Sequence, residues 1–436
     1  MNTRRDFLKR FTAGMGAGVL GPSLLNAQHT PGGSHSATRR ETGRAAGAPV
    51  PVETPDVPNL PHKLDNGVKV FHLVAEPVRR ELVPGRVMDV WGFNGMCPGP
   101  TIQVTQGDRV RVILDNHLPE PTSIHWHGFE IPIAMDGMPY ISQEPVPPGG
   151  RFVYEFTLHQ EGTFFYHSHG AMQEMMGMVG MFVMHPKRAH APRVDRDFGI
   201  ILQGWAILPN NTVPNTAGME FNWLTFNGRS GPHTTPMLVR LGDRVRIRMV
   251  NLSMDHHPIH LHGHTFYVTG SEGGRQPEVT WGPGNTVLVG VAQSRDIEFV
   301  ANNPGDWMVH CHLPHHMMNN MSDLMGERMI TTSPLTPQQA ERQMDIMQKL
   351  GAHGTHGGAQ AHPRVATNAT SVPGFPQDAF MEMVMDQAVT KPETFGLVKN
   401  WTAGMMGMMS LLRVLPPEQY ERIVAMKQDP HEHQHQ

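Results

Sequence analysis

Four pairs of histidines, each separated by a single residue, are the side chains of this sequence best suited to binding metal ions. The pairs are His125 with His127, His167 with His169, His260 with His262, and His310 with His312. In a β-strand, residues i and i+2 point to the same face, so each pair would present two imidazoles side by side. Eight imidazoles serve three metal ions if two ions take three each and one takes two. Imidazole binds copper, zinc, iron and nickel, so the pairs alone leave the metal open.

The fourth pair contains a cysteine, and this residue selects copper. In His310-Cys311-His312 the thiol points to the strand face opposite the two imidazoles. Three further candidate ligands lie near it in the sequence: His257, His316 and Met321. A cysteine with two histidines and a weak axial methionine is the ligand set of a blue-copper site, which is suited to one-electron transfer. We therefore expect Cys311 to join an electron-entry copper to the metal ions that the two flanking imidazoles hold.

The motifs stand in matching registers because the sequence contains two copies of one unit. The stretch 104–112 matches 239–247, and the match continues without a gap from the first histidine pair to the third. A second match aligns His167-Ser168-His169 with His310-Cys311-His312. Chance supplies roughly two His-x-His pairs among 28 histidines in 436 residues, but not four pairs in corresponding registers.

Alternating apolar residues predict the elements that position these motifs. Runs such as 109–113 and 244–248 alternate apolar with charged residues, and Gly-Asp and Pro-Gly turn signals separate them. This pattern is typical of antiparallel strands, so we expect an all-β fold with two domains of the same architecture. The first domain would span 61–190, and the second, which holds the blue-copper ligands, 195–335. Each domain is expected to be a Greek-key β-sandwich.

The first copy lacks the blue-copper ligands. Where the second copy has His257, Cys311 and His316, the first copy has Thr122, Ser168 and Gln173. We therefore expect one blue-copper site per chain, in the second domain.

The composition agrees with a turn-rich β protein and limits its partners. Gly (45) and Pro (38) are plentiful, and the net charge of −4 gives no reason to expect nucleic acid or an anionic membrane as a partner. The 32 methionines and 28 histidines are metal-ligand residue types, although flexible methionine also fills cores. Cys97 is the only other cysteine, and we expect a buried thiol there and not a disulfide with Cys311.

The N-terminal segment has the pattern of an export signal. The run Thr3-Arg4-Arg5-Asp6-Phe7-Leu8-Lys9, followed by a mild apolar stretch over 11–25, predicts a twin-arginine signal peptide covering 1–27. Its apolar part is too short and too glycine-rich for a stable membrane span. We therefore expect the protein to be periplasmic. Residues 28–60, rich in Pro, Gly, Ala and Thr, are expected to form a disordered linker.

The C-terminal segment, 336–436, is a Met- and His-rich extension beyond the two copies. Helices are expected in it over about 336–350, 376–389 and 417–427. Methionines also crowd behind the second and fourth motifs, at 172–184 and 317–329, where they could capture Cu(I) as a substrate or pack loops and cores. Two alternatives also remain for the last Met and His groups, which could bind copper loosely or form a packed cover and a solvated tail. These groups are Met405, Met406, Met408 and Met409, and His431, His433 and His435.

Taken together, the four motifs resemble the copper motifs of the laccase-like multicopper oxidases. The resemblance rests on 125–128, 167–169, 257–264 and 310–321, and it extends over about 61–335. It implies a type 1 copper bound by His257, Cys311, His316 and Met321, and a type 2 copper bound by His125 and His260. It also implies two type 3 coppers, one bound by His127, His167 and His312 and the other by His169, His262 and His310.

The resemblance also implies an activity that uses four copper ions. A phenolic or aromatic substrate, or Cu(I), would give four electrons singly to the type 1 copper, and Cys311 would conduct them to the three-copper cluster, where O2 becomes water. Asp136 stands where laccases carry an acid and is the candidate proton donor, although a turn aspartate capping its own backbone is the alternative. The rival functions are a copper nitrite reductase, disfavoured by Ser168, and a copper-sequestering protein, disfavoured by the Cys311 bridge.

The number of units departs from the better-known laccases. Those have three cupredoxin domains, whereas this sequence has two and is similar to the two-domain laccases. In that group the cluster lies between domain one of one chain and domain two of its neighbour. The resemblance thus implies a homotrimer with clusters between chains, a ring that heterologous contacts can close.

Overall fold

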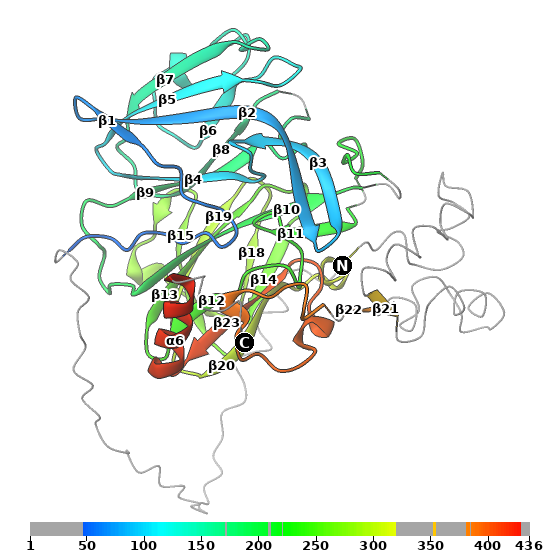
Figure 1. Cartoon of the computed structure of the whole chain (residues 1–436). Coiled ribbons are helices and arrows are strands. Elements are labelled where there is room, and N and C mark those ends of the chain that lie inside the picture. The colour runs from blue at the N-terminus through cyan, green and yellow to red at the C-terminus, as the bar shows by residue number, and fades with distance from the viewer. Residues whose placement is uncertain are drawn as a thin grey trace, which may run out of the picture. The chain divides into compact units, whose positions relative to one another are not determined.

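The structure, a computed structural model, describes residues 47–170, 172–207, 211–219, 221–319, 352–354, 381–383 and 385–428. Within these ranges the chain forms strands, turns and short 3-10 segments, with one α-helix, α6 (Pro417–Gln428) (Figure 1). The expected all-β class is therefore confirmed. In the same ranges, no helix has the length and apolar character needed to cross a membrane.

Nine strands of the first half form two sheets around one core. They are β1 (Lys63–Asp65), β2 (Val68–Val83), β3 (Arg86–Phe93), β4 (Gly99–Thr105), β5 (Arg109–Asn116), β6 (Ile124–His127), β7 (Arg151–Thr157), β8 (Gly162–Ser168) and β9 (Val179–His185). One sheet has the order β1-β2-β5-β7, with β3 paired to β2, and the other has the order β4-β9-β8-β6. Apolar side chains of both sheets, including Phe71, Trp126, Tyr166 and Phe182, pack in one buried cluster.

The second half is built from two further sheets. Its strands are β10 (Arg196–Trp205), β11 (Trp223–Phe226), β12 (Met237–Arg240), β13 (Arg244–Asn251), β14 (His257–Leu261), β15 (Phe266–Ser271), β16 (Gly274–Arg275), β17 (Pro283–Gly284), β18 (Thr286–Val289), β19 (Ser294–Val300), β20 (Gly305–Cys311) and β23 (Met409–Leu415). The sheet orders are β11-β10-β13-β19-β15-β16, with β17 on β15, and β12-β23-β20-β14-β18. Their buried side chains form a second core that includes Cys311.

The histidine motifs lie on corresponding strands of the two halves. Strand β6 pairs antiparallel with β8, which sets His125 opposite His167, and β14 pairs antiparallel with β20, which sets His260 opposite His310. Directly opposed residues of paired strands have neighbouring side chains, so the pairing assembles each group of imidazoles. The outer strands correspond as well, because β4 pairs in parallel with β9 as β12 does with β23.

The expected end of the second unit at 335 is wrong, because β23 comes from the segment assigned to the extension. Figure 1 shows this late, red-coloured strand among the green strands of the second half. It lies between β12 and β20, with Met237 opposite Leu412 and Gly305 opposite Val414. All of its residues are buried. In the first half β9 fills this place soon after His167 and His169, whereas in the second half the corresponding strand comes much later in the chain.

Two other expectations for the chain ends are also corrected in part. Residues 47–60 of the expected linker are packed: Val50, Val52 and Val57 are buried, and the Glu53 amide donates to the Asp197 carbonyl at 2.9 Å. Their apolar side chains pack in the buried interior. An expectation of disorder that rests on composition takes no account of such packing. In the expected helix 376–389, the described residues form β22 (Met381–Met383), paired with β21 (Ala352–Gly354), and turns.

The remaining expectations for the ends have mixed outcomes. The helix expected over 417–427 is confirmed as α6, whose Ile423 packs on Leu238 and Leu415. The signal peptide 1–27 and the helix expected over 336–350 lie outside the described residues. The shorter elements of the fold are η1 (Ile133–Met135), η2 (Glu278–Thr280), η3 (Pro314–Met317), η6 (Pro392–Thr394) and η7 (Trp401–Gly404).

Candidate metal centres

Cys311, His257 and His316 converge in the core of the second half. His257 begins β14, Cys311 ends β20 and His316 lies in η3, so three elements each supply one ligand atom. The Nδ1 atoms of the two imidazoles are 3.1 Å apart, and the Cys311 Sγ lies 3.6 Å from that of His257 and 3.4 Å from that of His316. All three side chains are buried. The predicted cluster of these three residues is therefore present in the fold.

The chemistry of this donor set fits copper. One thiol and two imidazole nitrogens are soft to intermediate donors that suit Cu(I) and Cu(II). Burial raises the pKa of Cys311 to about 12, and burial with the neighbouring His316 lowers the pKa of His257 to about 3. A buried thiolate without a cation is costly, so a metal ion that binds all three atoms would remove that cost. Met321, the expected fourth ligand, lies outside the described residues.

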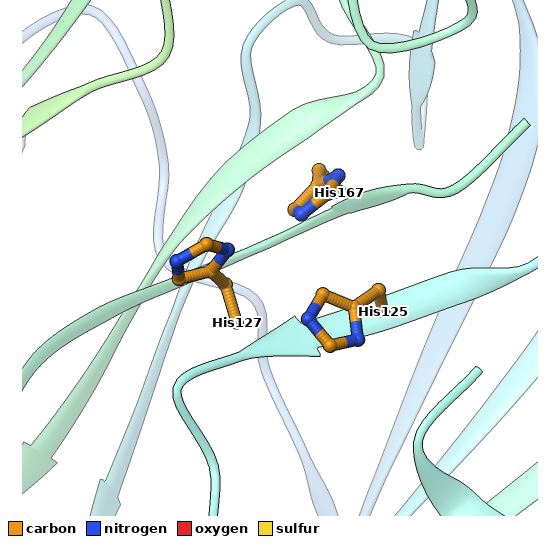
Figure 2. A group of neighbouring side chains, drawn as sticks. All are labelled: His125, His127 and His167. Atoms are coloured by element: carbon orange, nitrogen blue, oxygen red, sulfur yellow. The ribbon is translucent and has the colours of Figure 1, made fainter. Parts of the chain in front are cut away.

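The first histidine quartet consists of His125 and His127 from β6, His167 from β8, and His169, which directly follows β8. Figure 2 shows the rings of His125, His127 and His167 around a common space, two from one strand and one from its neighbour. The ring centroids of His125 lie 5.7, 5.3 and 5.5 Å from those of His127, His167 and His169. Four imidazoles at such spacing can share bound metal ions.

The second histidine quartet consists of His260, His262, His310 and His312. The Nε2 atoms of His262 and His310 are only 3.0 Å apart, so at most one of them carries the proton between them. The His260 ring lies 5.6 Å from that of His310 and 5.5 Å from that of His312. His310 and His312 flank Cys311, so the backbone of β20 links this quartet to the thiol.

Backbone carbonyls orient four of these imidazoles. The Nδ1 of His125 lies 2.9 Å from the Asp136 carbonyl oxygen, and that of His260 lies 2.7 Å from the Asn285 carbonyl oxygen. His167 and His310 each place Nδ1 2.9 Å from the carbonyl oxygen of the next residue. A carbonyl can only accept, so Nδ1 carries the proton and Nε2 is left free as a metal ligand.

The two quartets are separate within one chain. All eight histidines belong to the described residues, and ring contacts join members of the same quartet. In this part of the chain, no ring contact joins a histidine of the first quartet to one of the second. Each half of the chain therefore carries four imidazoles of the eight that a three-metal cluster requires.

Two carboxylates accompany the first quartet. Asp136, the predicted proton donor, has a carboxylate oxygen 3.5 Å from His125 Nδ1. Glu174, which the sequence reasoning did not single out, has a carboxylate oxygen 3.2 Å from His167 Nδ1. Although burial acts against the charged imidazole, the hydrogen bond and the charge of Glu174 raise the pKa of His167. Its place in the sequence, directly after Gln173, does not show which imidazole it faces.

Hydrogen bonds join the three residues at the first-half counterpart of the Cys311 cluster. Thr122 Oγ1 and Ser168 Oγ both donate to Gln173 Oε1, at 2.7 and 2.6 Å. The three side chains are buried, so each polar atom needs the partner that it finds here. The three residues that correspond to His257, Cys311 and His316 are thus joined to one another by hydrogen bonds.

Most of the clustered methionines pack in cores. Met178, Met181 and Met184 are fully buried, and Met405, Met406, Met408 and Met409 are buried as well. Met172 is exposed. These buried side chains are part of the packed interior, whereas Met321, Met325, Met329 and the three histidines 431, 433 and 435 lie outside the described residues.

Comparisons with known proteins agree with this geometry. Two sequence-family models, both described as multicopper oxidase, match residues 77–189 and 208–328, which together make up more than half of the chain. The "Blue Copper Oxidase from Nitrosomonas europaea" is similar in structure, with 32% identity and a TM-score of 0.54 over 58% of this chain and 81% of that chain. "Multicopper Oxidase mgLAC" has the same identity, TM-score and coverage.

Curated relatives match over shorter stretches. "Copper resistance protein A" of Pseudomonas syringae pv. tomato is 34% identical over 148 residues, 34% of this chain and 24% of that protein. "Laccase-1" of Cryptococcus neoformans var. neoformans is 31% identical over 213 residues, 40% of this chain and 34% of that protein. The chain thus spans 24% and 34% of the length of these two relatives.

Proposed function

Because this chain belongs to the multicopper oxidase family, we propose that it is a copper-dependent oxidase that couples four one-electron oxidations of a reductant to the reduction of O2 to water. The observation that carries the proposal is the position of Cys311. Its Sγ faces the Nδ1 atoms of His257 and His316, while its two neighbours in sequence belong to the second quartet. One residue thereby connects two groups of metal ligands.

The proposed copper ligands are those of the motifs. His257, Cys311 and His316 would hold a type 1 copper, and His125 with His260 a type 2 copper. His127, His167 and His312 would hold one type 3 copper, and His169, His262 and His310 the other, giving four ions per active unit. When bound, copper would supply one-electron transfer at the Cys311 set and O2 reduction at the quartets.

The residues of the chain have three tasks in this reaction. Cys311 provides a short covalent path from its sulfur through β20 to His310 and His312. The backbone carbonyls behind His125, His167, His260 and His310 hold each ring with Nε2 presented to the metal. Asp136 Oδ1, beside His125, is placed to hold a proton for O2 reduction.

We also propose that the complete cluster forms between chains, in a homotrimer. The support is the division of the eight histidines into two quartets. Exposed apolar side chains flank both: Ile133, Tyr140 and Ile141 are 68, 79 and 73% exposed in the loop after His125, and Leu288, beside the His260 strand, is 57% exposed. Exposed apolar surface around an incomplete site suits contact with a second copy of the chain.

A cationic reductant, including Cu(I), is the substrate class that the surroundings of His316 favour. The Asp255 carboxylate lies 3.7 Å from His316 Nε2, on the side of the ring away from the thiol, and it is 44% exposed. Met254 beside it is 46% exposed. A carboxylate and a thioether at the edge of an electron-accepting imidazole would attract a soft cation more than a neutral phenol. Export to the periplasm by the twin-arginine segment remains part of this proposal.

The test is spectroscopic and catalytic. The copper-loaded protein should show an intense visible thiolate-to-Cu(II) absorption band, bind about four copper ions per chain and consume O2 with a phenol and with Cu(I). Cys311→Ser should lose the band and the activity but keep the copper of the quartets. Wild-type protein without the band, or with one copper per chain, would refute the proposal. Asp255→Asn should lower kcat/KM for Cu(I) more than for the phenol.

A further inference from the structure

We propose that Met408, and not Met321, is the axial thioether ligand of the Cys311 site, and that a long insertion interrupts the ligand loop between His316 and this methionine. The inference rests on the proposed function, because it concerns the copper ion that Cys311 would bind. Sequence spacing places Met321 in the axial role, since it follows His316 after a short interval. The hydrogen bonds around Cys311 assign that role to Met408.

Two backbone hydrogen bonds hold Met408 beside the other ligands. The Cys311 amide donates to the Met408 carbonyl at 3.0 Å, and the Met408 amide donates to the His316 carbonyl at 2.8 Å. Met408 is fully buried and lies in the same core cluster as Cys311. Its thioether is therefore confined to the dry surroundings of the thiol, where a weak axial donor acts.

The first half contains the same arrangement and identifies the position. There the Ser168 amide donates to the Met178 carbonyl at 3.0 Å, and the Met178 amide donates to the Gln173 carbonyl at 3.3 Å. Ser168 corresponds to Cys311 and Gln173 to His316, so Met178 corresponds to Met408. The sequence contains the same signal, because Met-Met-Gly-Met occurs at 175–178 and again at 405–408.

The glycine before Met408 must approach the ligand loop closely. Gly407 has a φ of +65°, and a Cβ at this residue would lie 2.2 Å from the His316 carbonyl oxygen. A side chain cannot fit there, so glycine is required to bring this backbone against His316. The residue that follows is thereby held at the ligand set.

The chain leaves and rejoins the site at one point. The Asn319 side chain accepts a hydrogen bond from the Gly407 amide at 2.9 Å and donates to the Gly231 carbonyl at 2.8 Å, while the Gly231 amide donates to the Gly407 carbonyl at 2.8 Å. These bonds join the two ends of the insertion. In the first half, the chain passes from Gln173 to Gly177 and Met178 without any insertion.

Substitutions at three methionines test the assignment in copper-loaded, full-length protein. Met408→Leu removes the donor at nearly constant volume and should raise the midpoint potential of the blue site, because the thioether stabilises Cu(II) more than Cu(I). Met408→Gln offers a harder oxygen donor and should lower the potential and change the EPR spectrum of the site. Met321→Leu and the matched control Met178→Leu should leave both unchanged.

The outcomes separate this inference from the proposed function. Wild-type protein without a blue band would refute the proposed function. A blue band whose potential shifts in Met321→Leu, and stays constant in Met408→Leu, would refute the axial assignment alone. Met321→Leu decides the question even if neither Met408 variant folds, because an unchanged potential excludes Met321 and a shifted potential excludes Met408.

Discussion

The carboxylate of Glu174 lies 3.2 Å from Nδ1 of His167, whereas His310, the counterpart of His167 in the second half, has no carboxylate partner among the described residues. Met317 follows His316 where Glu174 follows Gln173. A carboxylate behind a metal-binding imidazole fixes its tautomer and increases its basicity. The two quartets therefore differ in charge, and the first should hold copper more tightly for this reason.

Glu174→Gln should weaken copper binding by the first quartet by about 10- to 100-fold, because the amide keeps a hydrogen-bond acceptor but loses the charge. Copper content after dialysis against graded chelator concentrations measures this change. The blue band should persist, since the Cys311 set lies elsewhere. Glu161→Gln is the matched control, because Glu161 pairs with Nε2 of His190, outside the motifs, at 2.8 Å. Equal copper retention in the two variants would contradict the role of Glu174.

Asp136→Asn should slow O2 reduction by about 100-fold or more and leave the blue absorption unchanged, because general acids contribute on that scale. The Asp136 carbonyl that orients His125 is unaffected by the substitution. Stopped-flow reoxidation of the reduced protein by O2 measures the rate. Asp108→Asn is the control, since Asp108 Oδ2 accepts from the Thr105 amide and Asp108 belongs to none of the histidine motifs. An unchanged reoxidation rate in Asp136→Asn would show that Asp136 is not the proton donor and acts only as a turn residue.

Mixing two inactive variants should restore activity if clusters form between chains. One variant carries His127→Ala and His169→Ala, and the other carries His262→Ala and His310→Ala, so neither forms a complete cluster. In randomly mixed trimers about a quarter of the interfaces would join two intact quartets, and O2 uptake should recover to about that fraction of wild type. Light scattering on the same samples gives the assembly size. A monomer, or no recovery after unfolding and refolding the mixture together, would exclude the trimer.

Stability should fall in mild acid because of histidines outside the metal sites. Burial and Arg229 lower the pKa of His233 to about 3, and burial and Arg248 lower the pKa of His185 to about 4. Because the pKa is lower in the folded than in the unfolded protein, the unfolded protein binds protons first as the pH falls. The contribution of each histidine to the free energy of unfolding is therefore fully present above its ordinary pKa of 6.5 and is lost as the pH falls toward 3–4. Each group should cost up to about 1.4 kcal/mol per pH unit in this window.

Urea unfolding of the copper-free protein between pH 7.5 and 4.5 measures this loss. His233 Nδ1 accepts a hydrogen bond from Arg229 at 2.9 Å, which protonation would break. His233→Gln should therefore flatten the pH dependence. An identical slope in wild type and His233→Gln would show that His233 is not one of the titrating groups.

The local pattern of residue types in the sequence was sufficient to predict strands and most of the residues of the candidate site. Alternating residues predicted the strands β5 and β13, and the His-x-His spacing predicted which imidazoles share a face, because both depend only on the two-residue period of a strand. The approach of His257 and His316 to Cys311 also followed from motif spacing. The helix α6 was found from its local signals alone.

Pairings distant in sequence could not be found in this way. Residues 47–60 look disordered by composition, but Val52 is buried against residues that lie far along the chain. Similarly, the sequence left loose copper binding or a packed cover open for Met405, Met406, Met408 and Met409, and neither alternative predicted the strand that fills the gap between β12 and β20. Glu174 was missed because nothing in the sequence shows which imidazole a nearby carboxylate faces.

The sequence alone determined the kinds of ligand, their grouping in two copies and the presence of a thiol between two imidazoles, because these properties follow from residue type and strand period. Only the tertiary structure decided that β23 closes the second half and that Met408 lies against Cys311 and His316. Those relationships depend on hydrogen bonds between strands that any length of chain can separate, so spacing carries no information about them.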